Sequence, residues 1–275
     1  MMMRMPLLRS WLTAGALAGL LLTPLMLAGC GSAGPKLPPA GSAEPDKFLF
    51  DHGNDAMAKK HWMEAREYYR NLVDRYPQSA YRADAKLALG DTYIAENTAE
   101  SRVLAINEFN EFLNFFPTSP RADYAQFRIG FAHYKQMLGP QRDQTETKEA
   151  IAQFAIFFKR FPNSTLTDEV KKYDREARDR LSESEFEVGR FYARMNWCPG
   201  AVDRLQGVLK EDPEFTNRDG VYFYMAECYF KSNQKPAALA WYDRIVKEFQ
   251  KSDYLNKAKK RISEIKRPAA ATSPK

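Results

Sequence analysis

Alanine followed four residues later by an aromatic residue or leucine recurs along the chain, and a proline follows eight residues further on. The phrase occurs five times, with glutamine in the proline position of the last copy, and its alanines are Ala65, Ala105, Ala150, Ala201 and Ala238. Positions four apart lie on one face of a helix, so each pair marks the buried face of an amphipathic helix. A proline cannot continue a helix, so each unit ends there.

A small residue stands upstream of every such alanine. These residues are Gly53, Gly90, Gly130, Gly189 and Ala226. The order small, aromatic, alanine, aromatic, proline is the tetratricopeptide pattern, a helix–turn–helix of about 34 residues. We therefore predict an all-α fold, a tetratricopeptide-repeat solenoid of about five helix pairs. Ser119 as N-cap and Pro120 as the first helical residue predict the start of one unit.

Residues 165–195, between repeats three and four, contain no proline and a single glycine. Apolar residues recur there at steps of three and four, which predicts one continuous helix of about 28 residues and roughly 42 Å. The helix separates the N-terminal repeats one to three, at 46–165, from the C-terminal repeats four and five, which occupy 166–267 together with the helix. The other long interval, between repeats two and three, holds a Gly-Pro loop at 138–145.

The first residues have the order of a bacterial secretory signal. Arg4 and Arg9 precede an apolar run at 11–28, and small residues lead to Cys30. A basic start, an apolar core and small residues before a cut site predict a signal peptide at 1–29. The ending Leu-Ala-Gly-Cys resembles the lipobox of bacterial lipoproteins, so we expect Cys30 to be acylated and to become the first residue of the mature protein.

The residues around the cut site also predict where the protein is attached. A retained transmembrane helix is the alternative, but two glycines and a proline interrupt the short apolar run. Gly31 stands in place of the aspartate that resembles an inner-membrane retention signal, which favours a lipid anchor on the periplasmic face of the outer membrane. Proline, glycine and alanine dominate 30–45, which predicts a flexible tether. We expect a disordered tail at 268–275.

The net charge of +6 is a property of the ends of the chain. Removal of the signal takes away two arginines, and the last nineteen residues, 257–275, hold seven basic residues against Glu264 alone. The rest of the mature chain is slightly acidic, and an exported protein does not meet the nucleoid, so we expect no nucleic acid partner. We interpret the basic end as solvated, with docking on anionic headgroups or an acidic partner as the alternative.

The residues that usually carry catalysis or bind metals lack the required spacing. His52 and His133 fall in helical repeat frames, where a packing role is expected, and no histidine pair has metal-ligand spacing. No glycine-rich phosphate loop and no nucleophile elbow is found, so we expect no enzymatic activity and no cofactor apart from the lipid on Cys30. An oxidising compartment allows a disulfide between Cys198 and Cys228, but their positions in the repeat frame do not obviously face each other.

Several short sequence motifs between residues 141 and 213 resemble those of one family of envelope proteins. They are Asp143-Gln144-Thr145, Arg160-Phe161-Pro162-Asn163-Ser164, Asp179-Arg180-Leu181, Glu185, Val188, Phe191-Tyr192, Ala201-Val202-x-Arg204 and Val208-Leu209. The family is that of BamD, the tetratricopeptide lipoprotein of the β-barrel assembly machine. The lipobox, the five units and the long helix add to the specificity of this resemblance, which covers nearly all of the mature chain.

The resemblance implies a scaffold of the β-barrel assembly complex, with other lipoproteins of the complex as further partners. In that family the C-terminal repeats dock on the last periplasmic domain of BamA, the barrel subunit. The N-terminal repeats form a groove implicated in receiving unfolded outer membrane proteins. Arg204 matches a family arginine in the BamA-facing region, and Asp143 lies in a loop similar to the family's third repeat, so both are candidate partner-binding residues. For Arg204 the alternative is a surface arginine paired with a neighbouring acid.

A different periplasmic scaffold remains the alternative function. Examples are a cell-division coordinator of the Tol–Pal region and a pilus-assembly lipoprotein. Coordinators of the Tol–Pal type usually carry an N-terminal coiled coil and lack a lipobox, unlike this chain. The sequence departs from the BamD family at Trp197-Cys198-Pro199-Gly200 and in its long basic end.

Overall fold

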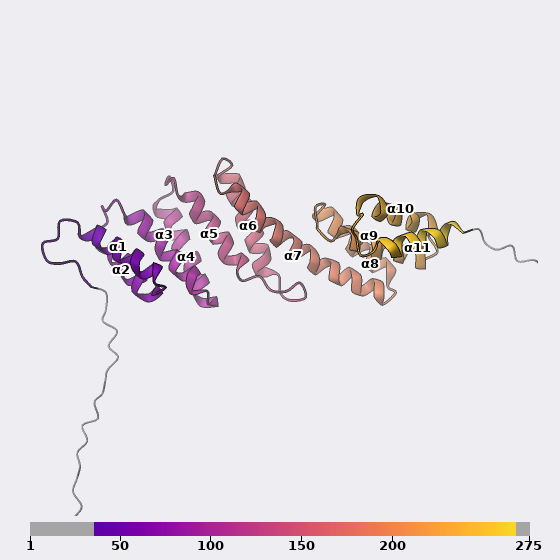
Figure 1. Ribbon diagram of the computed structural model, residues 1–275, viewed down its shortest axis with the longest axis horizontal. Coiled ribbons are helices and arrows are strands. Elements are labelled where there is room, and N and C mark those ends of the chain that lie inside the picture. The colour runs from indigo at the N-terminus through magenta and orange to yellow at the C-terminus, as the bar shows by residue number, and fades with distance from the viewer. Residues whose placement is uncertain (1–35, 268–275) are drawn as a thin grey trace, which may run out of the picture. The chain divides into compact units, whose positions relative to one another are not determined.

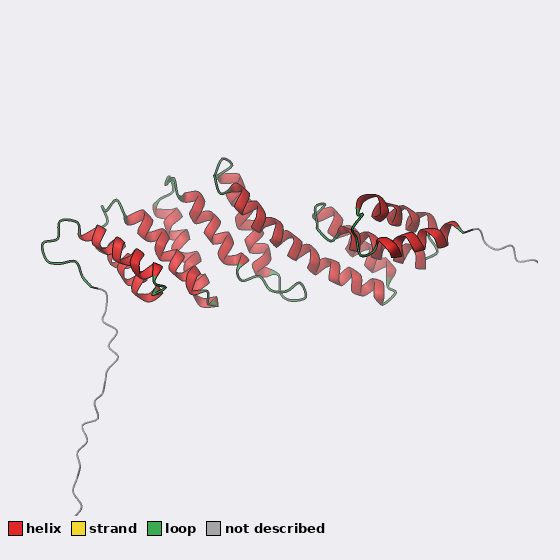
Figure 2. Ribbon diagram, in the orientation of Figure 1, coloured by secondary structure: helices red, strands yellow, loops and turns green. Residues whose placement is uncertain are grey.

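The computed structural model of the protein describes residues 36–267 (Figure 1). Eleven helices make up its regular structure, and this part of the chain contains no strand (Figure 2). The helices are α1 (Pro45–Ala58), α2 (Trp62–Arg75), α3 (Arg82–Glu96), α4 (Ala99–Phe115), α5 (Ala122–Tyr134), α6 (Thr145–Arg160), α7 (Thr167–Arg194), α8 (Cys198–Glu211), α9 (Arg218–Lys231), α10 (Lys235–Glu248) and α11 (Leu255–Lys266). The predicted all-α tetratricopeptide fold is confirmed, since α1 to α10 form five helix pairs.

A short turn joins the two helices of a pair in four of the five pairs. One residue of each turn has a left-handed backbone, with φ between 59° and 62°: Lys60, Asn97, Asn196 and Asn233. Asparagine tolerates this conformation better than most residues do, and a left-handed residue ends a helix abruptly. The third pair has a ten-residue connection instead, at 135–144 between α5 and α6.

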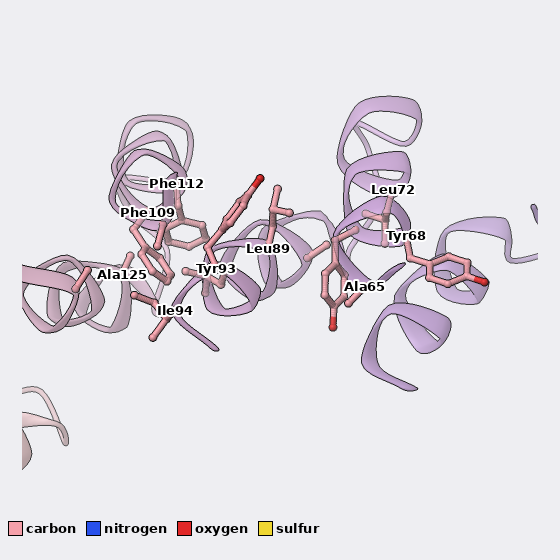
Figure 3. Packing of buried hydrophobic residues seen from close by; sticks show 14 of the residues in the cluster. Ala65, Tyr68, Leu72, Leu89, Tyr93, Ile94, Phe109, Phe112 and Ala125 are labelled. Carbon is pink, nitrogen blue, oxygen red and sulfur yellow. The ribbon is translucent and has the colours of Figure 1, made fainter. Parts of the chain in front are cut away.

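Glycine on one helix of a pair leaves space for a large side chain of the other. In each of the first four pairs, a Cβ atom added to the glycine would lie 2.5–2.7 Å from that side chain. The pairs are Gly53 with Tyr69, Gly90 with Phe109, Gly130 with Phe154 and Gly189 with Leu205. Close packing of this kind explains why the small residue and the large one recur together. Figure 3 shows Phe109 and Phe112 of α4 beside Tyr93 and Ile94 of α3.

A serine caps most of the turns that lead from one helix pair to the next helix. Its hydroxyl accepts a hydrogen bond of 3.0–3.1 Å from the amide two residues later, for Ser79, Ser119, Ser164 and Ser252. The prediction that Ser119 is an N-cap and Pro120 the first helical residue was wrong. Pro120 lies in a turn and α5 begins at Ala122, because the serine caps this turn rather than the helix itself.

The predicted long helix is confirmed as α7, which has 28 residues. Val170 and Ala177 near its start belong to a core cluster with residues of α5 and α6. Phe186 further along belongs to a second cluster with residues of α8 and α9. Ala193 in its last turn belongs to a third cluster with residues of α8 and α9, so one helix contributes to three hydrophobic clusters. The assignment of 46–165 and 166–267 as separate groups of repeats stays a prediction.

The last helix, α11, covers the fifth helix pair. Its residue Ala258 is fully buried in a cluster with Tyr242 and other residues of α9 and α10. Arg261 donates to both carboxylate oxygens of Glu227 on α9, at 2.8 Å from Nε and 3.1 Å from Nη2. A terminal helix of this kind shields the end of a repeat array from water. The basic stretch that begins at Lys257 is thus helical as far as α11 extends.

The structure describes neither 1–35 nor 268–275. The predicted signal peptide at 1–29, Cys30 and the predicted tail therefore lie outside the described residues. Of the predicted tether, residues 36–45 are described. Residues 36–44 contain no helix, Pro45 is the first residue of α1, and the amide of Lys36 donates to the hydroxyl of Tyr68 at 3.0 Å. Within the described range, no helix combines the length and the apolar character needed to cross a membrane.

Candidate functional site

Arg204 lies on α8, at a groove of about 600 Å³ between α6, α7 and α8. Apolar side chains and charged side chains of both signs line this groove. The lining residues are Lys148, Ile151, Arg178, Leu181, Ser182, Glu185, Asp203, Arg204, Gly207, Val208, Glu211 and Asp212. We call this the Arg204 groove. It lies where the third repeat, the long helix and the fourth repeat meet.

Arg204 forms an ion pair with Glu185 of α7. Its Nη1 atom donates to Oε2 of Glu185 at 2.7 Å, and the two side chains are 48% and 47% exposed. Water screens a pair this open, so it contributes only about 0–1 kcal/mol to stability. Among the described residues, this is the one hydrogen bond that the Arg204 guanidinium makes, and its other N–H groups can serve a further acceptor.

Asp212 lines the same groove and ties the end of α8 to α7. Nη1 of Arg175 donates to Oδ1 of Asp212 at 3.0 Å and Nη2 donates to Oδ2, while the hydroxyl of Ser182 donates to Oδ2 at 2.7 Å. The aspartate is only 8% exposed. Burial by itself would raise the pKa of this carboxyl, but the hydrogen bonds from Arg175 and Ser182 outweigh it and lower the pKa below its usual value.

The turn after α8 departs from the pattern of the other turns. Asp212 stands where the other four repeats have an aromatic residue, at Tyr76, Phe116, Phe161 and Phe249. Phe215 replaces the capping serine and is buried against Phe186 of α7, with ring centroids 6.2 Å apart. Contacts with the long helix therefore fix this turn, whereas a serine fixes the others. Comparing the repeats position by position could have found this aspartate from the sequence.

Asp143 does not line the Arg204 groove. Its Oδ1 atom accepts a hydrogen bond from the amide of Thr145 at 2.9 Å at the start of α6, and this bond lowers the pKa of the carboxyl. Gln144 shapes the same loop, since its side chain donates to the carbonyls of Gly139 at 2.8 Å and Arg142 at 3.0 Å. This role of Gln144 was not predicted from the sequence. A role of Asp143 in binding a partner stays a prediction.

A second groove, of about 620 Å³, lies between the loop at 140–142 and the last turns of α7. Arg142, Arg190 and Arg194 line it, and Phe191 beside them has a side chain that is 58% exposed. Arg190 pairs with Glu187. The sequence did not predict this groove, because a periodic pattern does not show which apolar residues a neighbouring loop leaves uncovered.

The histidines in the described range have packing and hydrogen-bonding roles. His52 stacks on Phe48 with ring centroids 3.9 Å apart, and Nδ1 of His133 contacts Oε2 of Glu146 at 2.8 Å. Across residues 36–267, no group of three or more His, Cys, Asp or Glu side chains gathers in a way that could hold a metal ion.

The recurring helix pair, with glycine or alanine on one helix against a large side chain of the next, defines this chain as a tetratricopeptide-repeat protein. Its sequence matches a family model over residues 42–237. The chain belongs to that family, which is described as YfiO, outer membrane lipoprotein. The family associates the chain with the outer membrane.

Known relatives confirm the resemblance to the BamD family. A Caulobacter vibrioides protein named outer membrane protein assembly factor BamD is 24% identical over 204 residues, which cover 74% of this chain and 66% of that protein. The Haemophilus influenzae protein of the same name is 25% identical over 222 residues, or 77% of this chain and 82% of that protein. Among solved structures, the TPR2AB domain of yeast Sti1 in its pHSP90 complex aligns with 82% of this chain and 84% of that chain, at 15% identity and a TM-score of 0.48.

Proposed function

We propose that the protein is a non-enzymatic scaffold of the machinery that assembles β-barrel proteins, and that it docks on a BamA-like barrel subunit. Acylated Cys30 attaches it to the periplasmic face of the outer membrane, and its repeats help to receive unfolded outer membrane proteins. The names of its BamD relatives and the outer-membrane family support this proposal. Stacked helix pairs also suit it physically, since they offer broad surfaces for extended peptides and other domains.

The observation that carries the docking proposal is the Arg204 groove. Because the pair between Arg204 and Glu185 is half open to water, a carboxylate of a partner can replace Glu185 at little cost. A guanidinium makes two directed hydrogen bonds to a carboxylate, a geometry that lysine cannot copy. Ile151, Leu181 and Val208 add apolar surface for the same partner to cover.

Arg204→Leu is expected to weaken binding of the BamA-like subunit with little effect on folding. Losing one side of a desolvated charged pair costs about 2–5 kcal/mol of binding, which corresponds to at least roughly a tenfold loss of affinity. Loss of the open pair within the chain costs at most about 1 kcal/mol of stability. Co-purification with the barrel subunit and thermal melting of the same variant measure the two effects.

Arg121→Leu is the matched control. Arg121 also forms a half-exposed ion pair, with Asp84 at 3.5 Å, and this pair does not line the Arg204 groove. It should leave co-purification unchanged. A variant with leucine at 204 that retains wild-type binding would remove Arg204 from the docking site. A lowered melting temperature with undiminished binding would show that Arg204 acts only in folding.

Acylation at Cys30 is expected to be required for membrane attachment. The lipobox-like ending at residue 30 predicts it, and several acyl chains hold a protein on a membrane far more firmly than one does. The intact mass of protein extracted from membranes should equal that of a chain starting at Cys30 plus its lipid. Cys30→Ala should release the protein from membranes, and a variant that stays bound would contradict the anchor.

A further inference from the structure

Cys198 and Cys228 come from neighbouring helices and lie in one buried cluster. Cys198 is the first residue of α8, and Cys228 lies in the last turn of α9. Their side chains pack together with Ala193 and Ala201, and both thiols are free in the structure. The expectation that the two positions do not face each other was wrong. Successive helices of the array run in opposite directions, so the start of α8 lies beside the end of α9, the first helix of the next pair.

A lysine holds this end of α9 in place. Nζ of Lys231 donates to Oδ1 of Asn196 at 2.8 Å and to the carbonyl of Ala193 at 3.3 Å. Asn196 is the left-handed residue of the turn that enters α8, so Lys231 fastens the last turn of α9 to the turn before Cys198. The alanines beside the sulfur atoms are fully or almost fully buried and have no side chain beyond Cβ to hold the helices apart. The two thiols are therefore held close together by contacts on both sides.

Cys228 is shielded from solvent, so Cys198 is the one thiol within its reach. The side chain is 1% exposed. Burial in apolar surroundings, together with the neighbouring Cys198 thiol, raises the pKa of Cys228 to about 12. A thiol that stays protonated and buried reacts poorly with reagents from solution. Cys198 is less completely buried, at 7% exposed, and is the one of the two that an outside reagent reaches first.

We propose that Cys198 and Cys228 are joined by a disulfide in the exported protein, which links the fourth repeat covalently to the fifth. The inference rests on the proposed periplasmic location, because disulfides persist in the bacterial periplasm and not in the cytoplasm. With Cys30 acylated, the mature chain has only these two thiols. One pairing within the chain is therefore available.

The oxidant is a protein disulfide or a small-molecule disulfide. The thiolate of Cys198 attacks one sulfur of the donor, forming a mixed disulfide and releasing the other donor sulfur as a thiolate. The thiol of Cys228 then gives up its proton, and its sulfur attacks the sulfur of Cys198 and displaces the second donor thiolate. The chain loses two electrons and two protons, and the donor gains both, as a dithiol from a protein disulfide or as two thiols from a small-molecule disulfide.

Sequential alkylation of the full-length protein tests this directly. Protein from membranes of exporting cells is denatured in acid, alkylated with one maleimide, reduced, and alkylated with a heavier maleimide before peptide mass mapping. We expect Cys198 and Cys228 to carry only the second label, and a linked peptide to be found before reduction. Free thiols that take the first label in most molecules would overturn the proposal.

Stability provides an independent measurement. The link closes a loop of about thirty residues, so reduction should lower the melting temperature of the wild type by about 5 °C or more. Cys228→Ala and Cys198→Ala should each melt at the same temperature with and without reductant. A wild type that also melts at one temperature in both conditions would argue against a link that forms part of the folded protein.

Two further experiments show whether a negative result contradicts the disulfide or the proposed periplasmic location. Protease added outside the inner membrane should reach the exported chain, and a chain without residues 1–29, kept in the cytoplasm, should take the first label. A protease-accessible chain with free thiols overturns the disulfide alone. If the protease does not reach the chain, the location is wrong, and glutathione disulfide added to the purified protein decides the pairing by whether the linked peptide forms.

Discussion

Phe154→Ala is expected to lower the free energy of unfolding by about 3–5 kcal/mol. The ring is fully buried between helices, in a cluster with Phe127, Phe157 and Val170. It fills the space that Gly130 leaves, so its loss creates a cavity at the α5–α6 contact. Urea unfolding followed by circular dichroism measures the change.

Two controls make this prediction specific. Phe115 ends α4 with a side chain that is 64% exposed, and Phe115→Ala should change stability by no more than about 0.5 kcal/mol. Gly130→Ala should destabilise the wild type, since the new Cβ would lie 2.5 Å from the Phe154 ring. In the Phe154→Ala background the same change should be nearly harmless. Additive effects of the two substitutions would mean that they do not share one contact.

Asp212→Ala is expected to destabilise the protein by about 3 kcal/mol. Removing one partner of a buried pair leaves the other charge poorly compensated, and Arg175 would keep only its contact with Asp179 at 3.2 Å and a longer one with Glu214 at 3.9 Å. Arg175 is partly exposed, at 28% of its side chain, so water offsets some of the loss. Asp203→Ala is the control, because Asp203 lines the same groove but is exposed and has no ion-pair partner among the described residues. That change should stay within about 0.5 kcal/mol.

Hydrogen exchange measures which helices lose stability in the Asp212→Ala variant. Amides of α8 and α9 should exchange faster, while those of α3 and α4 should be unchanged, because the tie joins only the later repeats to α7. Equal acceleration throughout the chain would contradict the prediction that 166–267 behaves as a group distinct from 46–165.

Lowering the pH should remove the stabilisation by Asp212 without a mutation. The hydrogen bonds of Asp212 lower the pKa of its carboxyl in the folded protein below the ordinary value of 3.8. The stabilisation is therefore fully present above that value and is lost as the pH falls through the lower, folded pKa. Between pH 5 and about pH 3, wild type should lose more stability than Asp212→Asn, which cannot titrate at this position. Parallel losses in the two proteins would contradict the assignment.

The fold was predictable because each unit carries its signals within a short stretch. Ala150 and Phe154 are four residues apart, so one helix reveals the pair without knowledge of its neighbours. The length of α7 followed from the absence of any proline between 165 and 195. The failure at Pro120 has a local cause as well, since Ser-Pro begins a capped turn as readily as a helix.

The groove was only partly predictable, because its contacts join distant segments. The resemblance to a family pointed to Arg204, but its partner Glu185 lies nineteen residues away on another helix. Arg175 and Asp212 are separated by thirty-seven residues, and no periodicity relates them. The two cysteines were misjudged for the same reason. The spacing pattern within one repeat predicts the contacts inside each helix pair well, but it does not predict the contacts between one repeat and the next.

The serine-capped turns bear on how such an array grows in evolution. Ser79, Ser119 and Ser164 make the same local contact, so a duplicated unit that begins at one of these turns brings its own start signal with it. The turn after α8 has no such independence, because Asp212 needs Arg175 on the long helix. Gene duplication can therefore lengthen the first part of the chain unit by unit, whereas the long helix and the repeats that follow it must be inherited as one block.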